Sequence, residues 1–230
     1  MPHKGIMYRL IAISSAIVIA GIILSGPPAV YFISLIRSQP DWVNVQTFID
    51  HYHPVQNLAW TGGFLLILGF AFFIASSYQL AVSPSQRVPA LLAIVFVTIF
   101  AVLAGVNYSL QIAWVPVLAG QEHEALSLIT MSNTNSIAWI LEMFGYGFLG
   151  LSTWCISMVF WGSKRMNLIR YLLIANGIIS IAGAMVTTGG VDWLFQTLGI
   201  ISYIIWNLLI LFAMALIYYE FRKRRKKGGH

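Results

Sequence analysis

Long apolar runs follow one another from residue 8 to residue 219 of this 230-residue chain. Each run is at least as long as the roughly 20 residues that a helix needs to cross a bilayer. Only 9% of the residues are charged, against about 25% in soluble domains. Because backbone polar groups in hydrocarbon must be paired within their own segment, runs of this length predict helices. We therefore expect an all-α polytopic membrane bundle, and the composition excludes a soluble enzyme and a disordered scaffold.

The apolar runs predict six transmembrane helices in a single bundle, residues 1–221. They cover residues 8–36, 54–80, 88–118, 136–161, 168–188 and 193–219. The first run contains Pro27 and Pro28, which lack a backbone donor and clash with the preceding turn. We therefore expect the first helix to kink or break there. A basic tail, residues 222–230, follows the bundle.

The basic residues are distributed unevenly between the loops, and this asymmetry predicts the orientation of the bundle. If the N-terminus is cytoplasmic, every lysine and arginine except Arg37 falls on the cytoplasmic side. The tail holds a basic cluster beside the last span, which is typical of a stop-transfer signal facing anionic lipid. We expect both termini in the cytoplasm and a multi-pass protein of the cell (inner or plasma) membrane. Its partner is then the lipid bilayer, and no nucleic acid is expected.

Glu142 is the only acidic residue within a predicted span. The fourth helix is predicted to enter the membrane from outside near Ser136, which at 1.5 Å per residue places Glu142 roughly 9 Å below the outer boundary. An ionisable group at that depth costs a few kcal/mol when lipid surrounds it. We therefore expect this side chain to face the bundle interior, either as a proton, cation or amine site or as a structural carboxyl.

Depth also predicts which polar residues lie near Glu142. Four further candidates for ligand binding lie near this depth: Asn107 and Gln111 in the same outer third, Asn57 slightly shallower, and Tyr146 one turn below Glu142 on the same face. Asn107 and Gln111 are four residues apart and share one helix face. Together with the proline break, these residues predict a polar pocket that opens to the outside, with Glu142 at its floor. The alternative is a set of interhelical hydrogen bonds that only hold the bundle together, each contributing about 1 kcal/mol.

Three histidines in predicted external loops, His51, His53 and His123, are weak candidates for a metal site with neighbouring carboxylates. A His-x-His pair in a loop fixes no geometry, so we predict no metal. No histidine lies within a span, which excludes a haem held between helices. No motif of a hydrolase or of a nucleotide-binding enzyme occurs. We therefore expect no cofactor and no catalytic residue, which favours a protein that is not an enzyme.

Three short stretches carry a resemblance to known proteins. The segment Glu142–Gly150 (EMFGYGFLG), the pair Asn107–Tyr108 and the step Ala175–Asn176–Gly177 resemble a functionally unassigned family of six-helix prokaryotic integral membrane proteins. The resemblance covers most of the chain and implies a fold and a membrane location. It implies no activity, so no residue role is transferred from it.

These observations lead to three functional hypotheses. The first is a protein that binds or transports a small solute, ion or lipid through the polar pocket centred on Glu142. The second is a non-catalytic membrane subunit or anchor of a larger complex, and a homo-oligomer is left open as well. The third is an intramembrane enzyme that modifies lipid, which requires a second reactive group within about 4 Å of Glu142.

Overall fold

The structure, a computed structural model, describes residues 2–121 and 123–227, and the elements in this part of the chain are helical. They are α1 (Pro2–Ser25), α2 (Pro27–Ile36), α3 (Val45–His51), η1 (Pro54–Gln56), α4 (Asn57–Tyr78), α5 (Pro84–Ser109), η2 (Leu110–Trp114), α6 (Val115–Gly120), α7 (Leu126–Ile129), α8 (Ile137–Ser157), α9 (Lys164–Thr187), η3 (Asp192–Phe195) and α10 (Thr197–Lys227). Five segments are long and apolar enough to cross a membrane: Gly5–Ile36, Pro54–Tyr78, Pro84–Gly120, Lys164–Thr187 and Thr197–Arg225. The described part of the chain is thus all-helical, and these five segments indicate a membrane protein.

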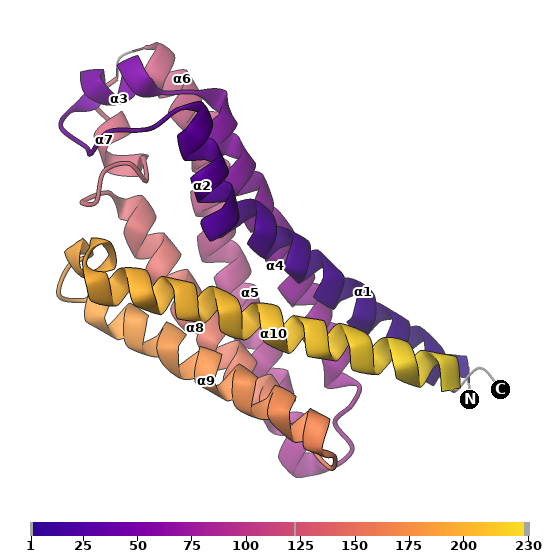
Figure 1. Cartoon of the computed structure of the whole chain (residues 1–230). Helices are drawn as coiled ribbons and strands as arrows, with labels where there is room; N and C mark the ends of the chain where they lie inside the picture. The colour runs from indigo at the N-terminus through magenta and orange to yellow at the C-terminus, as the bar shows by residue number, and fades with distance from the viewer. Residues whose placement is uncertain (1, 122, 228–230) are drawn as a thin grey trace.

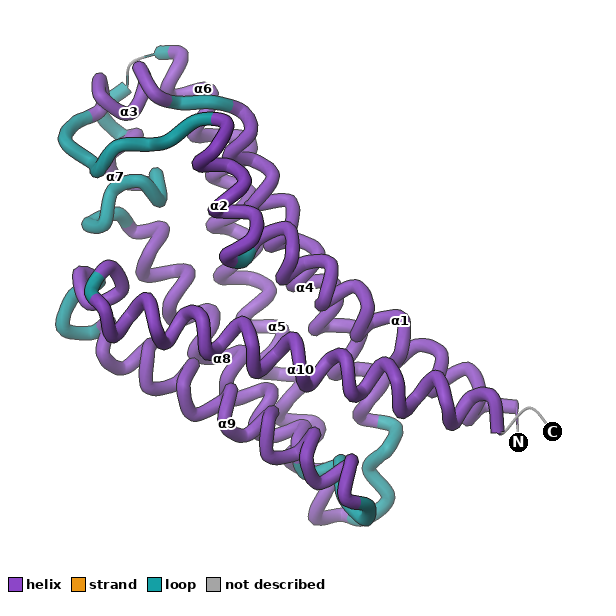
Figure 2. Tube along the Cα trace, in the orientation of Figure 1, coloured by secondary structure: helices purple, strands orange, loops and turns teal. Residues whose placement is uncertain are grey.

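Six long helices form a ring in which sequence neighbours pack side by side (Figure 1). α1 packs against α4, α4 against α5, α5 against α8, α8 against α9 and α9 against α10. α10 then returns to pack against α1. The start of α1 and the end of α10 lie together, and we call this the terminal end of the bundle. The short helices α3, α6 and α7 gather at the opposite end, the cap end (Figure 2).

The apolar core has two parts. The main cluster fills the ring, with Phe70 of α4 and Phe100 of α5 fully buried at its centre. A smaller cluster joins the short helices of the cap end through Phe48 of α3, Leu118 of α6 and Leu126 of α7. The cap is therefore a packed layer with its own apolar contacts rather than a set of loose loops.

Close approach of helices depends on glycine at the α8–α9 interface. A Cβ atom at Gly150 would lie 2.8 Å from the carbonyl oxygen of Gly177, and one at Gly177 would lie 2.7 Å from the carbonyl oxygen of Gly150. Both separations are shorter than a van der Waals contact, so any larger residue would force the helices apart. Small residues serve this purpose at helix interfaces in membranes, where backbones must approach closely.

The first span breaks at the two prolines. α1 ends at Ser25 and α2 begins at Pro27, with Gly26 between them in an extended conformation. At the break the chain touches α10, because a Cβ at Gly26 would lie 2.7 Å from Oδ1 of Asn207. Beyond the break, α2 packs against α4 and η1. The prolines therefore separate α1, which packs extensively against α4, from α2, which contacts α4 only weakly.

The third span begins before the apolar run from which it is predicted. α5 starts at Pro84 rather than at residue 88, because Oε1 of Gln86 accepts hydrogen bonds from the N–H groups of Val82 and Ser83. Backbone donors that precede the helix are thereby satisfied. The apolar run therefore identifies only the part of the helix that can lie in hydrocarbon, and it omits the polar first turn.

The basic segment that follows the last span is mostly helical. α10 continues to Lys227, and residues 228–230 of the predicted tail lie outside the described part of the chain. Glu220 supports this extension, since its Oε1 accepts from Nε of Arg224 at 3.0 Å and its Oε2 lies 3.6 Å from a guanidinium nitrogen of Arg165 in α9. The tail is therefore joined to the bundle through charge.

Candidate functional site

The carboxyl group of Glu142 joins α8 to α5. Its Oε2 accepts a hydrogen bond from Nδ2 of Asn107 at 2.9 Å, and its Oε1 accepts one from the hydroxyl of Tyr108 at 2.8 Å. Asn107 and Tyr108 are consecutive residues in the last turn of α5, and both are buried. The carboxyl thus faces the bundle interior, where neutral donors replace the water that it would lose.

Tyr108 is the centre of an aromatic cluster. Its hydroxyl lies 3.1 Å from that of Tyr146, and its ring stacks on Trp60 of α4 with the centroids 5.9 Å apart. Gly63 makes room for this ring, because a Cβ atom there would overlap with it. Tyr146 in turn meets Trp206 of α10 edge to face, with the centroids 5.0 Å apart. The cluster connects the carboxyl site with α4 and α10.

Gln111 ties the site to the segment between α7 and α8. Its Nε2 donates to Oδ1 of Asn107 at 3.2 Å and to the carbonyl oxygen of Ile129 at 2.7 Å. Its Oε1 accepts from the N–H of Met131 at 3.1 Å. Nε1 of Trp139 donates to the carbonyl oxygen of Met131 at 2.9 Å, which holds the same segment from α8. Residues 129–131 therefore cover this side of the site.

A π-helical turn, η2, follows α5 and carries Gln111. The N–H of Val115 donates to the carbonyl oxygen of Leu110, five residues earlier. Pro116 comes next and lacks the N–H that a regular helix would direct at the carbonyl oxygen of Ile112. Turns of this kind are frequent at functional sites. Here the turn lies between Asn107 and the cap, at the point where the span meets the covering segment.

Four of the five predicted ligand-binding residues meet at this site: Glu142, Asn107, Gln111 and Tyr146. Tyr146 joins through the hydroxyl of Tyr108, a residue that is not among those predicted to bind a ligand. The sequence feature that could have indicated Tyr108 is its position directly after Asn107. The fifth residue, Asn57, has a buried Oδ1 with no hydrogen-bond partner in the described residues, and no hydrogen bond links it to the other four.

The three candidate metal ligands are not brought together. Nδ1 of His53 and Nδ1 of His123 each accept from the backbone N–H two residues later, so each ring serves its own turn. Nδ1 of His51 lies 2.9 Å from the carbonyl oxygen of Thr47. Within residues 2–121 and 123–227, no group of three histidine, cysteine, aspartate or glutamate side chains could hold a metal ion.

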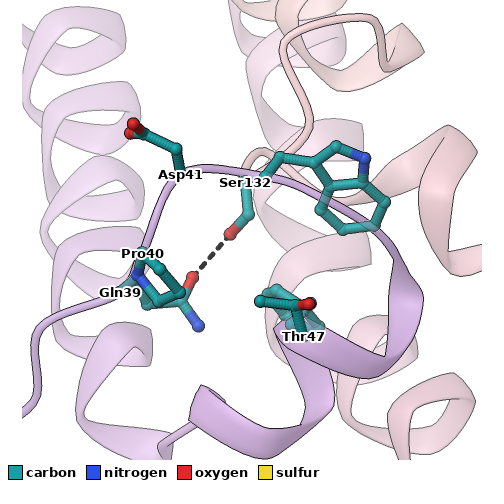
Figure 3. Close-up of a pocket in the computed structure, with 7 residues that line it drawn as sticks. Gln39, Pro40, Asp41, Thr47 and Ser132 are labelled. Carbon is teal, nitrogen blue, oxygen red and sulfur yellow. Dashed lines mark hydrogen bonds between the residues drawn. The ribbon is translucent and has the colours of Figure 1, made fainter.

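The segment that covers the site is also tied to the far side of the cap. Ser132, next to Met131, donates to Oε1 of Gln39 at 2.7 Å across a small pocket that Phe48 also lines (Figure 3). A second hollow, an apolar groove, lies between α8 and α9. Neither hollow includes Glu142. The outward-open pocket that the sequence predicts is therefore not one of these two hollows.

No cation offsets the Glu142 carboxyl in the part of the chain that the structure describes. Both of its hydrogen-bond donors are neutral, and the ion pairs found among these residues join Glu220 to Arg165 and Arg224. A carboxylate taken out of water without a paired cation is expensive. A proton or a bound cation would therefore stabilise the site.

Comparison of the chain with protein-family models, with curated proteins and with solved structures finds no match. The resemblance to six-helix prokaryotic membrane proteins thus gains no family assignment, and the function has to be argued from the site itself.

Proposed function

We propose that this membrane protein binds, and through that binding transports or senses, a small solute or ion that carries positive charge. The observation that carries the proposal is the Glu142 carboxyl, whose donors Asn107 and Tyr108 are neutral and which has no cation beside it among the described residues. Neutral donors orient a carboxylate but leave its charge uncompensated. A ligand cation supplies the missing partner, and Gln111 and Tyr146 fix the geometry of its surroundings.

The arrangement that we propose in the membrane has six spans: the five segments named above and α8. α8 packs between α5 and α9, both of which are long and apolar enough to span, and it carries the Glu142 carboxyl, which is bonded to α5. In this arrangement the terminal end, with its basic residues, faces the cytoplasm of the cell membrane, and the cap end faces outside. The positive charge of the tail then lies beside the anionic leaflet.

The experiment that tests the proposal is the thermal stability of the detergent-purified protein in the presence of sodium, potassium, calcium or propylamine. A ligand that binds only the folded protein stabilises it by about 2.7 kcal/mol at 100 times its Kd. We expect at least one of these cations to raise the melting temperature of the wild type and to leave that of Glu142→Gln unchanged. The substituted amide keeps the shape of the side chain and removes its charge.

Glu220→Gln is the matched control for this experiment. It makes the same chemical change at a carboxyl that already has two arginine partners, so the response to the cation is expected to persist. Two results contradict the proposal. In one, Glu142→Gln responds to the cation as the wild type does. In the other, no cation acts on the wild type, and the variant is as stable as the wild type from about pH 4 to 9.

A membrane subunit of a larger complex is the second candidate. The observation that favours it is α2, which exposes large apolar side chains, among them Tyr31, Phe32 and Leu35. Purification in a mild detergent, followed by identification of any chain present in equal amount, tests it. A lipid-modifying enzyme has less support, because no serine, histidine or aspartate shares the described hydrogen bonds of Glu142.

A further inference from the structure

The two halves of α10 differ in how completely the bundle covers them. Near the terminal end, Ile210, Met214 and Ile217 are fully buried. Towards the cap end, the large apolar residues from Leu198 to Leu208, apart from Trp206, are 42–69% exposed. Because exposed residues there include three consecutive positions, 203–205, this half of α10 is uncovered on more than one face.

The uncovered half of α10 lies opposite α2. α1 packs against α10 and closes the ring near the terminal end, whereas α2 packs against α1, α4 and η1 and has no comparable packing with α10. The separation starts at the proline break, where Gly26 still touches Asn207. Figure 1 shows α2 and α10 diverging from this level towards the cap end. α2 and α10 are therefore not packed together on this side of the ring, which we call the open side and which lies within the apolar part of the bundle.

At the cap end, the described residues pack closely between water and the carboxyl site. The cluster around Phe48 and Leu126 packs the short helices together, Gln111 holds residues 129–131 with two hydrogen bonds, and Ser132 is bonded to Gln39. These contacts lie between the carboxyl site and the cap end. The side between α2 and α10 is thus the less obstructed approach to the interior.

The open side leads to Glu142. Tyr146 of α8 touches Trp206 of α10, and one helical turn further towards the cap end lie Glu142 on α8 and Tyr203 on α10. Tyr203 is 42% exposed at the open side. Glu142 itself is only half-buried, although its donors on α5 are buried. Glu142 is thus less completely enclosed than the two side chains that hold it on α5.

We propose that the ligand is a cationic amphiphile that reaches the site from the bilayer, between α2 and α10. Its protonated amine would pair with Glu142, and its hydrocarbon chain would lie against Tyr203 and the exposed apolar residues of α2 and α10. Charge complementarity selects the headgroup, and the apolar walls select the chain. This inference rests on the proposed function and names the ligand class for the same site.

The test compares dodecylamine, propylamine and dodecanol on the protein in phosphatidylcholine nanodiscs. The long amine has both headgroup and chain, the short amine has only the headgroup, and the alcohol has only the chain. Apparent Kd is measured from melting temperature against ligand concentration, expressed for the long-chain probes as mole fraction in the bilayer. Three variants are compared with the wild type: Glu142→Gln, Tyr203→Trp, which fills the open side, and Phe212→Trp, a control on the lipid-exposed surface of α10 nearer the terminal end.

We expect dodecylamine to bind the wild type, and Tyr203→Trp and Glu142→Gln each to raise its apparent Kd by about tenfold or more. Phe212→Trp should change it little, and neither propylamine nor dodecanol should bind comparably. If propylamine binds as well as dodecylamine, depends on Glu142 and ignores Tyr203→Trp, access from the bilayer is overturned and the proposed function stands. If the binding of dodecylamine depends on Tyr203 but not on Glu142, the proposed function fails, and the open side binds only a hydrocarbon chain. If no probe depends on either residue, both proposals fail.

Discussion

The position of Tyr108 is constrained from two sides, because its hydroxyl interacts with two partners. It donates to Glu142 at 2.8 Å and lies 3.1 Å from the hydroxyl of Tyr146. Its ring is held between α4 and α5 by Trp60 and by the space that Gly63 leaves. Any change in the position of this ring therefore moves a hydrogen bond of the carboxyl.

Tyr108→Phe removes the hydroxyl and keeps the ring. Because a buried carboxyl oxygen then loses its donor, we expect the free energy of unfolding to fall by about 1–2 kcal/mol. Thermal unfolding in detergent measures the change. Tyr171→Phe, at a side chain that is 65% exposed on α9, is the control and should have little effect. An equal loss for Tyr108→Phe in the presence of Glu142→Gln would show that the hydroxyl and the carboxyl are not coupled.

Gly63→Ala tests the space beside the ring. A Cβ at this position overlaps with the Tyr108 ring, so the ring must shift and its bond to Glu142 must lengthen. We expect a lower melting temperature and a weaker response to the cation that stabilises the wild type. Gly105→Ala is the matched control, since the nearest atom to its added Cβ is 3.9 Å away. Equal behaviour of the two alanine variants would contradict the predicted strain.

At the scale of elements, η2 links the site to its cover. Gln111→Leu keeps the approximate size of the side chain and removes both hydrogen bonds to residues 129–131. Because the N–H of Met131 loses its acceptor, we expect faster hydrogen exchange in this segment, by about tenfold for a loss of roughly 1.4 kcal/mol. Mass spectrometry of the deuterated protein measures it. Gln121→Leu, at an exposed residue of the cap, should leave the exchange unchanged; unchanged exchange in Gln111→Leu itself would refute the link.

Periodicity and hydropathy predict the long helices, but they miss what interrupts and caps them. The prolines after Gly26 do predict the break in the first span, because proline lacks the backbone N–H that a continuous helix needs. The π turn at Leu110–Trp114 has no such signature: Pro116 marks a disturbance in the third span but does not say which turn widens. The cap helices α3 and α7 lie in polar stretches that hydropathy does not identify as helical, since they are short and depend on packing against the rest of the cap.

At the scale of the molecule, the orientation in the membrane can be measured with two exposed valines at opposite ends. Val43 follows α2 at the cap end, and Val82 lies between α4 and α5. With Cys155→Ser as background, we expect a membrane-impermeant maleimide to label Val43→Cys in intact cells. Val82→Cys should react only after the membrane is opened, because the basic residues favour a cytoplasmic terminal end. The reverse labelling would overturn the proposed orientation.

The sequence predicts which residues form the candidate site better than it predicts how a ligand reaches them. Depth along each helix places Asn107, Gln111 and Tyr146 near Glu142, because rise per residue is nearly constant. It does not reveal which face of a helix meets which neighbour, so Asn57 reached the right depth without joining the hydrogen bonds. Nor does it reveal that α2 and α10 separate, since that depends on the direction that α2 takes after the proline break.

The contact between α1 and α10 has a consequence for how the protein is made. Segments enter the membrane in the order in which the ribosome delivers them, and these two are the farthest apart in that order. Side chains of α1 such as Ile11 and Val18, fully buried in the finished bundle, lie in a core that α10 helps to complete. The ring can close only after α10 has been inserted. Biogenesis must therefore hold an unfinished, lipid-solvated intermediate until α10 arrives.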